Sequence, residues 1–460
     1  MFRNIFNTFA NCFKIPELKS RILFTFGLLA IARLMSFIVI PGVDGAKLSA
    51  YFAEHEQGFG GLVGMYNTFA GGAFGNCGIG ALGIMPYISA TIILQLMSAV
   101  VPRLSKLARE EGGRAKIIQY GRYLTVLICL GQGAYFASSY ANPARVFPGL
   151  QGQLVLLDNI YFYYFLAVLV MTTGTMLLMW LGEQITERGV GNGVSLIITI
   201  GIVARIPVAA QGFDDMFFVP GHPNSLMGTG LLLLILSIIV IGGVIAVTQA
   251  QRKIPVQYAS RMIGQKMYQG GTNYMPLRVN YSGVMPIIFA SSILMIPQPI
   301  FTYLTEHTQQ PFIKDKVQWM AIQMGYGSPV YLGIYALMVI FFSYFWVATQ
   351  FNEIQIADDL KKNGGYIPGV RPGQQTSEYL HRAMSRITLA GAIFLAIIAT
   401  IPMLLGRQLQ INQNVASFFG GTSILITVGV LLDTMRQVES HLMMRHYDGF
   451  LKKGRLRGRF

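Results

Sequence analysis

Long, almost uncharged stretches limit what this chain can fold into more than any other feature. Ten of them are close to the roughly 20 residues that an α-helix needs to cross a bilayer. They lie at 21–40, 77–101, 117–139, 159–181, 190–210, 227–249, 282–303, 329–350, 387–405 and 416–434. Membrane-spanning strands alternate apolar and polar residues, and runs such as LLLLILSIIVIGGVIAV at 231–247 do not. The sequence therefore predicts an all-α polytopic membrane protein with ten transmembrane helices.

The distribution of Lys and Arg predicts the orientation of these helices, because basic residues collect in cytoplasmic loops. When the segments between the spans are assigned alternately to the two sides of the membrane, 28 Lys and Arg fall on the side that holds both termini and 6 on the other side. Both termini are therefore expected in the cytoplasm, which fits an even number of spans.

Two segments 200 residues apart share one pattern. Residues 83–94 read GIMPYISATIIL and residues 283–294 read GVMPIIFASSIL, so both obey G-x-M-P-x-I-x-A-x-x-I-L. Gly and Pro at the start of an apolar segment weaken a helix there. Paired, interrupted hydrophobic segments indicate internal duplication, with the functional pathway where the two halves meet. A chance match between repetitive membrane sequences is the alternative.

Groups that catalysis or ion coupling would need are almost absent from the predicted spans. Arg33, Arg122 and Arg205 lie in or at the ends of spans and Asp433 closes the last one, whereas ion-coupled transporters bury carboxylates or histidines. No ATPase, zinc-protease or serine-hydrolase motif appears, and the three cysteines are scattered. We therefore expect no enzymatic activity, no cofactor and no metal. A secondary transporter for small solutes, built from inverted repeats, and an intramembrane enzyme are the alternative classes.

The segment between the first two spans is unusual. No charged residue occurs from Gln57 to Pro102, which is about twice the length that one helix needs. Its first half, GFGGLVGMYNTFAGGAFGNCGIG, is too rich in glycine for a lipid-facing helix, and irregular backbone at membrane depth occurs only where it lines a cavity or is buried in protein. We expect a short re-entrant element that enters the bundle from the non-cytoplasmic side; a flexible external loop is the alternative.

The chain resembles the SecY/Sec61-alpha family, whose bacterial members are the channel subunits of the Sec protein translocase, over its whole length. The resemblance is carried by KIPELKSRILFT (14–25), TFAGGAFG (68–75), ALGIMPYISATIILQL (81–96), MWLGEQITERGVGNGVS (179–195), QRKIPVQYASR (251–261), MPLRVNYSGVMPIIFASSI (275–293), ADDLKKNGGYIPGVRPGQQT (357–376) and FFGGTSILITVGVLLDT (418–434). It implies two inverted, pseudo-symmetric halves around a central pore, with a plug and a lateral gate. It also implies a protein-conducting channel that passes unfolded secretory polypeptides, releases transmembrane segments laterally into lipid and is driven by a partner motor or the ribosome.

The resemblance implies a narrow ring in the pore, formed by Ile84, Ile88, Val194, Ile198, Ile288 and Ile426. All six side chains are β-branched and have few rotamers, which suits a stiff apolar collar. Such a constriction resists ions by dewetting and offers no hydrogen bonds to a passing chain. Position 194 departs from the isoleucine that is common in the family. Ordinary helix packing is the alternative for all six residues.

The resemblance also places the plug at about 61–75, including Gly61, Phe69, Gly71, Gly72 and Gly75. At the lateral gate it implies a polar seam of Gln95, Ser291 and Ser292. Polar contacts between membrane helices contribute only about 1 kcal/mol each, so such a seam could open for an apolar signal helix. The alternative is that these side chains form hydrogen bonds within their own helices.

Two basic loops are expected to dock partners. The resemblance implies binding of the ribosome or the SecA motor by Arg252, Lys253, Lys361, Lys362 and Arg371. Arg371 lies at a tip rich in Gly and Pro, YIPGVRPGQ, which can present one side chain to a partner. For the other basic residues, cytoplasmic topology and lipid head groups are the alternative explanation.

The expected partners are small membrane subunits resembling SecE and SecG, the SecA motor ATPase, the ribosome and its RNA, signal peptides and nascent polypeptides, and anionic lipids. The expected location is the plasma (inner) membrane. The expected organisation is an interfacial cytoplasmic N-terminus at 1–20, an N-terminal half with five spans at 21–212, the sixth span at 213–250, a basic cytoplasmic loop at 251–280, spans seven and eight at 281–350, a cytoplasmic loop at 351–386, the last two spans at 387–434 and a cytoplasmic tail at 435–460.

Overall fold

The computed structural model describes residues 15–54, 62–110, 112–143, 152–217, 227–258, 261–263, 266–268, 271–294, 297–308, 310–325, 327–408 and 422–453. The chain divides into two compact units. The first holds Met1–Val219, Asn412–Val415 and Val430–Phe460, and the second holds Pro220–Ile411 and Ala416–Gly429. Residues 1–14, where most of the predicted interfacial N-terminal segment lies, fall outside the described residues, as does Gly61.

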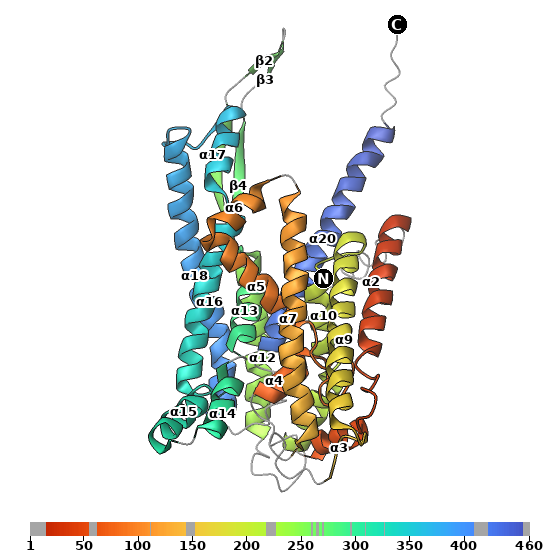
Figure 1. Cartoon of the computed structure of the whole chain (residues 1–460). Helices are drawn as coiled ribbons and strands as arrows, with labels where there is room; N and C mark the ends of the chain where they lie inside the picture. The colour runs from red at the N-terminus through yellow and green to blue at the C-terminus, as the bar shows by residue number, and fades with distance from the viewer. Residues whose placement is uncertain are drawn as a thin grey trace. The chain divides into compact units, whose positions relative to one another are not determined.

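The first unit is a bundle of helices (Figure 1). Its helices are α2 (Pro16–Leu34), α3 (Gly45–Glu54), α4 (Leu62–Phe69), α5 (Met85–Val100), α6 (Pro102–Arg109), α7 (Gly113–Ala141), α9 (Ile160–Arg188), α10 (Gly193–Val203) and α11 (Ile206–Phe217), together with α20 (Thr422–Lys453) from residue 430 onward. Helix α9 is central, because α7, α10, α2 and α5 all contact it. The bundle therefore builds its core around α9.

Six helices of the described part are long and apolar enough to cross a membrane. They cover Ala115–Ala141, Ile160–Arg188, Gly193–Gln211, Gly230–Gln249, Pro329–Lys362 and Gln374–Ile401. Two shorter apolar helices, Met85–Val100 and Met285–Leu294, lie within the predicted second and seventh spans. The predicted first and tenth spans correspond to α2, which begins at Pro16, and to α20, which is described from Thr422 onward.

The two repeated sequence segments share the same local backbone. Gly83 has φ +58° and Gly283 has φ +62°, a left-handed conformation that glycine adopts without a steric penalty. The next helix then begins at the equivalent methionine, as α5 at Met85 and as α13 (Met285–Leu294). The proline that follows lies in the first turn, where its missing N–H group costs nothing. The Gly-x-Met-Pro pattern therefore acts as a helix start in both units.

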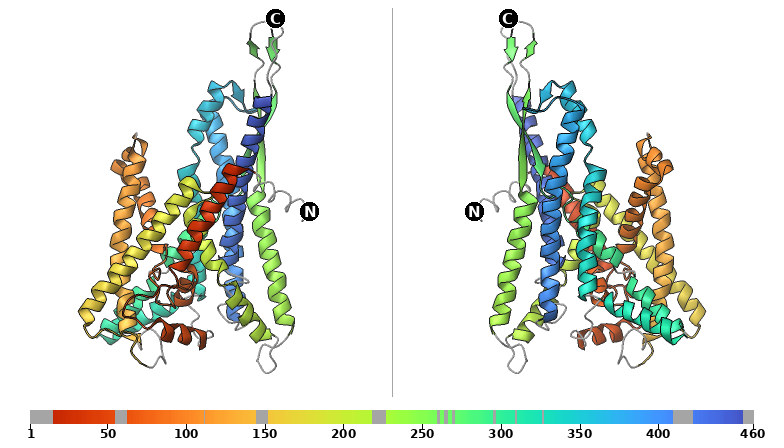
Figure 2. Two further views of the ribbon diagram at one scale, coloured as in Figure 1. Left: turned by 90° about the vertical axis from the view of Figure 1, so that its right-hand side faces the viewer. Right: turned by 90° about the vertical axis from the view of Figure 1, so that its left-hand side faces the viewer.

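The second unit combines apolar helices with a small sheet. Its helices are α12 (Met227–Gln249), α13, α14 (Pro297–His307), α15 (Pro311–Gln323), α16 (Pro329–Gln350), α17 (Glu353–Lys362) and α18 (Gln374–Gln408), and its strands are β1 (Gln251–Tyr258), β2 (Arg261–Ile263), β3 (Lys266–Tyr268), β4 (Thr272–Arg278) and β5 (Gly365–Tyr366). Helix α16 packs against α13 and α18, and α12 also contacts α18. In both side views of Figure 2 the green strands continue from the end of α12.

The sheet was not anticipated from the sequence, which predicted only a basic loop at 251–280. Strand β1 pairs antiparallel with β4 from Gln251↔Arg278 to Gln257↔Thr272, and with β5 through Gln257↔Tyr366 and Tyr258↔Gly365. Ile254 and Val256 on β1 are buried in a hydrophobic cluster, together with residues of β4, α16 and α18. The two predicted cytoplasmic loops are therefore parts of one packed module in the second unit.

Candidate functional site

The glycine-rich segment at 62–84 lies inside the first unit. It begins as helix α4 and continues through turns to the start of α5, and α4 contacts α10. The side chains of Phe69, Ala73, Phe74, Ala81 and Leu82 are all buried. A buried, uncharged segment without long regular structure fits the predicted re-entrant element, because such backbone is tolerated at membrane depth when protein surrounds it.

An aromatic cluster fixes the middle of this segment. The ring of Phe74 makes edge contacts with Phe52, Tyr66 and Phe136, with centroid distances of 6.3, 5.9 and 4.9 Å, and it lies 5.5 Å from the ring of Tyr140. The Tyr140 hydroxyl donates to the carbonyl oxygen of Phe74 at 3.1 Å. Edge-to-face aromatic pairs add about 0.5–1.5 kcal/mol each beyond their buried area. Phe74 is thus firmly anchored.

Hydrogen bonds tie the last turn of α4 to the residues that follow. The Tyr66 hydroxyl donates to the carbonyl oxygen of Leu82 at 2.7 Å. The side-chain oxygen of the buried Asn67 accepts from the backbone N–H of Gly75 at 3.0 Å, and the backbone carbonyl oxygen of Asn67 accepts from Gly72 N–H at 2.7 Å. The segment is therefore folded back on itself.

Two glycines allow a close approach between this segment and α10. Gly71 has φ +65°, and a Cβ atom added to it would lie 3.0 Å from the Cα of Gly201 and 2.9 Å from Nη1 of Arg33. A Cβ atom added to Gly201 would lie 3.2 Å from the Cα of Gly71. Neither position has space for a side chain, so the backbone of the segment rests directly on that of α10.

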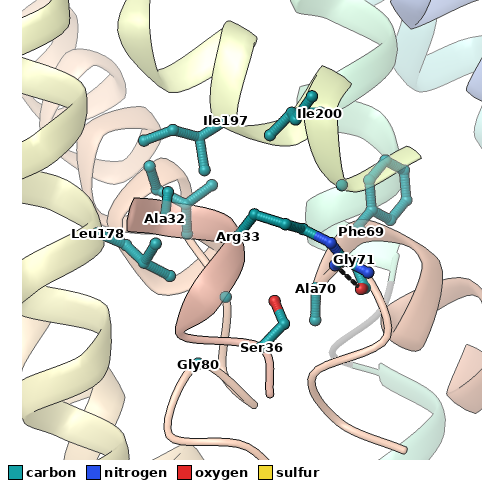
Figure 3. Close-up of a pocket in the computed structure, with 13 residues that line it drawn as sticks. Ala32, Arg33, Ser36, Phe69, Ala70, Gly71, Gly80, Leu178, Ile197 and Ile200 are labelled. Carbon is teal, nitrogen blue, oxygen red and sulfur yellow. Dashed lines mark hydrogen bonds between the residues drawn. The ribbon is translucent and has the colours of Figure 1, made fainter. Parts of the chain in front are cut away.

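A small cavity of about 30 Å³ lies beside this contact. Figure 3 shows Arg33 extending from α2 toward Gly71, whose carbonyl oxygen accepts a hydrogen bond from Arg33 Nη1. The residues that line the cavity include Arg33, Ser36, Phe69, Gly71, Ile84 and Gly201. A polar cavity of this volume can hold a water molecule.

The predicted ring residues have different surroundings. Ile84, Ile88 and Ile198 in the first unit are 2%, 4% and 1% exposed. Ile84 precedes the first helical residue of α5 and acts as its N-cap, and its carbonyl oxygen accepts from Ile88 N–H at 3.2 Å. Val194 is partly exposed, and one of its methyl groups packs against Gly182 of α9. Ile288 on α13 and Ile426 on α20 belong to the second unit and are buried.

The predicted gate residues are partly engaged within their own helices. The hydroxyls of Ser291 and Ser292 donate to the carbonyl oxygen of Ile288 at 2.9 and 2.7 Å, and both serines are buried. Gln95 on α5 is partly exposed, and its backbone carbonyl oxygen accepts from the Ser98 hydroxyl at 2.8 Å. The serine bonds match the alternative in which these side chains are satisfied locally, and a role in the gate stays a prediction.

The predicted docking residues gather in the second unit, on and near the sheet of β4, β1 and β5. Arg252 and Lys253 are exposed on β1. Lys361 and Lys362 are exposed in the last turn of α17, where their positive charges interact favourably with the helix dipole. Arg371 is exposed after β5, and its carbonyl oxygen accepts from the Thr376 hydroxyl at 2.9 Å. The pairing of β1 with β5 brings the two basic loops together.

Comparison with known proteins identifies the family. The SecY family model matches residues 78–435, which is well over half of the chain. The chain belongs to the SecY family. It is 42% identical over 460 residues to the protein translocase subunit SecY of Chlamydia muridarum, with 98% of this chain and 99% of that protein covered. It is 41% identical over 461 residues to the protein of the same name from Thermotoga maritima, with 99% and 100% covered.

Solved structures of this family share the fold. One, described as the structure of a protein conducting channel, matches with a TM-score of 0.59 and 19% identity over 95% of this chain and 94% of that chain. Sec61 in the canine ribosome-channel complex matches with a TM-score of 0.56 and 18% identity over the same shares. The predicted fold class is confirmed: this SecY family member is a multi-pass membrane protein with ten transmembrane helices in two halves. The predicted function, a protein translocation channel, is confirmed as well.

Three residues that hold the glycine-rich segment had no predicted role. Arg33 contacts Gly71, Arg205 donates to the Thr68 hydroxyl at 3.3 Å, and Asn67 binds Gly75. For the arginines a signal was present, because an ionisable residue within a membrane span usually has a function. Within the described part of the chain, no group of His, Cys, Asp and Glu could hold a metal ion.

Proposed function

We propose that this SecY family channel passes unfolded secretory polypeptides through a pore whose narrow ring is formed by Ile84, Ile88, Val194, Ile198, Ile288 and Ile426. The N-terminal half would extend over 21–212 and the C-terminal half to 434, and transmembrane segments would leave sideways through a gate at Gln95, Ser291 and Ser292. Burial of five ring residues supports an apolar constriction, which resists ions by dewetting while it yields to an extended peptide.

The segment at 62–84 carries this proposal. It is uncharged, many of its side chains from Asn67 onward are buried in the first unit, and it includes the predicted plug residues Phe69, Gly71, Gly72 and Gly75. Ile84 lines the same small cavity as Phe69 and Gly71, which links the predicted plug to the predicted ring. A segment of small residues can seal a pore and leave it with little loss of contact area. We assign the part of this segment up to Gly75 as the plug.

We propose that the cytoplasmic module docks the partner that drives transport. Arg252, Lys253, Lys361, Lys362 and Arg371 would bind the SecA motor or the phosphates of ribosomal RNA, since basic side chains favour both acidic proteins and nucleic acid. One structural relative, Sec61, is described in a ribosome-channel complex. Small membrane subunits resembling SecE and SecG and anionic lipids complete the expected environment. The protein would lie in the inner membrane with both termini in the cytoplasm.

Crosslinking of a stalled polypeptide tests the pore. The complex is reconstituted in proteoliposomes with a photoreactive amino acid in place of Ile198, and a secretory precursor is halted during transport. The matched control carries the same probe in place of Ile238 on α12, which is 68% exposed. The proposal predicts crosslinks from position 198 and none from position 238. Crosslinks from position 238 alone would show that the polypeptide follows another route.

A further inference from the structure

Two arginines from different parts of the bundle bind the plug segment at neighbouring positions. Arg33 on α2 donates through Nη1 to the carbonyl oxygen of Gly71, as Figure 3 shows. Arg205, between α10 and α11, donates through Nη1 to the Thr68 hydroxyl at 3.3 Å. Thr68 lies in the last turn of α4, and Gly71 lies two residues after the helix ends. The segment is thus held by cationic donors that belong to the surrounding bundle.

The contact of Arg33 depends on where the plug segment lies. Among the described residues Arg33 forms no ion pair, and its guanidinium also lies 5.0 Å from the centroid of the Phe37 ring. Its hydrogen-bond acceptor is the backbone carbonyl oxygen of Gly71, a residue with φ +65°. Hydrogen bonds from a charged donor are about twice as strong as neutral ones. The bond is lost if the segment moves.

The backbone contact with Gly201 determines where Gly71 lies against α10. The Cα atoms of Gly71 and Gly201 lie so close that neither residue has room for a Cβ atom. The cavity beside Arg33 has space for a water molecule. The guanidinium can therefore exchange the Gly71 carbonyl for water when the segment leaves, so the contact holds the segment without locking it permanently.

The residues that follow are fixed by other interactions. Phe74 lies in the aromatic cluster, and the carbonyl oxygen of Cys77 accepts from Ile40 N–H at 2.8 Å. Cys77 itself is fully buried. These contacts do not involve either arginine.

We propose that Arg33 and Arg205 are positioning residues that keep the plug segment seated against α10 in the idle channel. This inference rests on the proposed function of the segment as a plug. Removal of either donor shifts the equilibrium toward a position in which the residues around Thr68 and Gly71 have moved away from α10. The chain around Phe74 and Cys77 stays in place.

Thiol labelling of the assembled complex in membranes tests this. Ala70 lines the cavity, and the Ala70→Cys variant places a reporter thiol next to Gly71, while native Cys77 reports on the fixed part. Labelling by a membrane-impermeant maleimide is followed at each site by peptide mass spectrometry. Arg33→Gln and Arg205→Gln are each expected to increase the labelling rate at position 70 by about tenfold, the factor that corresponds to 1.4 kcal/mol, and labelling of Cys77 stays low.

The matched control is Arg122→Gln. Arg122 is also an arginine, on helix α7, but it pairs with Glu183 at 2.6 Å, and among the described residues it makes no hydrogen bond or ion pair with the plug segment. This variant should leave labelling at position 70 unchanged. Arg33→Lys keeps a cationic donor and should restore part of the protection. Ion conductance of the idle channel in planar bilayers should rise in the Gln variants of Arg33 and Arg205 and remain low in the control.

Unchanged labelling at position 70 in both variants would overturn the proposal. So would equal increases at position 70 and at Cys77, because these would mean general loosening of the bundle. If Arg33→Gln does not assemble, Arg205→Gln alone decides the outcome. Translocation of a secretory precursor by the unmutated complex is measured separately, so failure of the proposed function is distinguished from failure of the two arginines to hold the segment.

Discussion

Replacing Gly174 with alanine is expected to destabilise the protein, although alanine favours helix more than glycine does. Gly174 lies in the middle of α9 and faces the turn at the base of the plug segment. A Cβ atom at this position would lie 2.1 Å from the carbonyl oxygen of Ile79 and 2.8 Å from its carbonyl carbon. Carbon and carbonyl oxygen normally approach to about 3.3 Å, so helix and turn must separate by about 1 Å.

Hydrogen bonds hold the turn at Gly78 and Ile79 in place, so moving it costs free energy. Ile79 N–H donates to the carbonyl oxygen of Ile38 at 2.8 Å, and Gly78 N–H donates to that of Ala73 at 2.7 Å. Disturbing two such bonds costs about 1 kcal/mol each, and forcing extra volume into a packed site typically costs about 1–3 kcal/mol. The gain in helix propensity offsets at most about 1 kcal/mol. We therefore expect Gly174→Ala to lower stability by about 2–4 kcal/mol.

Gly131→Ala provides the matched control. Gly131 lies within α7, and nothing lies within 4 Å of a Cβ atom added to it. The same substitution should therefore be neutral or stabilising by up to about 1 kcal/mol. Thermal unfolding of the purified complex in detergent, followed by intrinsic fluorescence, compares the two variants. The reasoning is refuted if Gly174→Ala unfolds at the temperature of the unmutated complex, or if both variants shift in the same direction.

Three further predictions concern the ring, the docking loop and helix α3. Replacing Ile88 and Ile198 together by glycine should raise the ion leak of the idle channel severalfold in planar bilayers, and an unchanged conductance would exclude both from the constriction. Arg371→Glu should abolish most of the SecA ATPase activity that is stimulated by the channel, whereas Arg382→Ala, at another exposed arginine of the second unit, should leave it intact; equal activities in a coupled ATPase assay would remove Arg371 from the docking site. The pKa of Asp44 is lowered, chiefly because its carboxylate accepts a hydrogen bond from the backbone N–H of Lys47. The ionised carboxylate therefore stabilises the start of α3 at any pH above its usual pKa of 3.8. This stabilisation is lost as the pH falls through the lower pKa of the folded state. Asp44→Ala should therefore accelerate amide hydrogen exchange in α3 at neutral pH and have no effect near pH 2, and a difference that persists in acid would contradict this assignment.

The membrane helices could be predicted because their signal is local. A run such as 231–247 is apolar throughout, and its length fits one crossing of the bilayer. The starts of α5 and α13 could also be predicted, since Gly and Pro act on the backbone where they stand. Both kinds of signal need no knowledge of distant residues.

The sheet and the plug contacts depend on residues far apart in the sequence. Strand β1 pairs with β5, which lies more than 100 residues later, and β1 contains Pro255, a residue that usually argues against a strand between two neighbours. The alternation of buried Ile254 and Val256 with exposed Lys253 was a signal, but it is short. The bond from Arg33 to Gly71 likewise joins residues 38 positions apart, so only the folded chain reveals it.

The sheet of the second unit has a mechanical consequence. Strand β1 starts two residues after α12 ends, and it is hydrogen-bonded to β5, which lies between α17 and the Arg371 tip. Helix α17 packs against α18. A pull applied at the Arg371 tip is therefore transmitted to α12 through the hydrogen bonds between β5 and β1, which must break together. It is transmitted to α18 through the packing of α17. Strand β1 and the β5 loop, separated by about a hundred residues, therefore move as one rigid unit. A force on either of them acts on α12 and α18 at the same time.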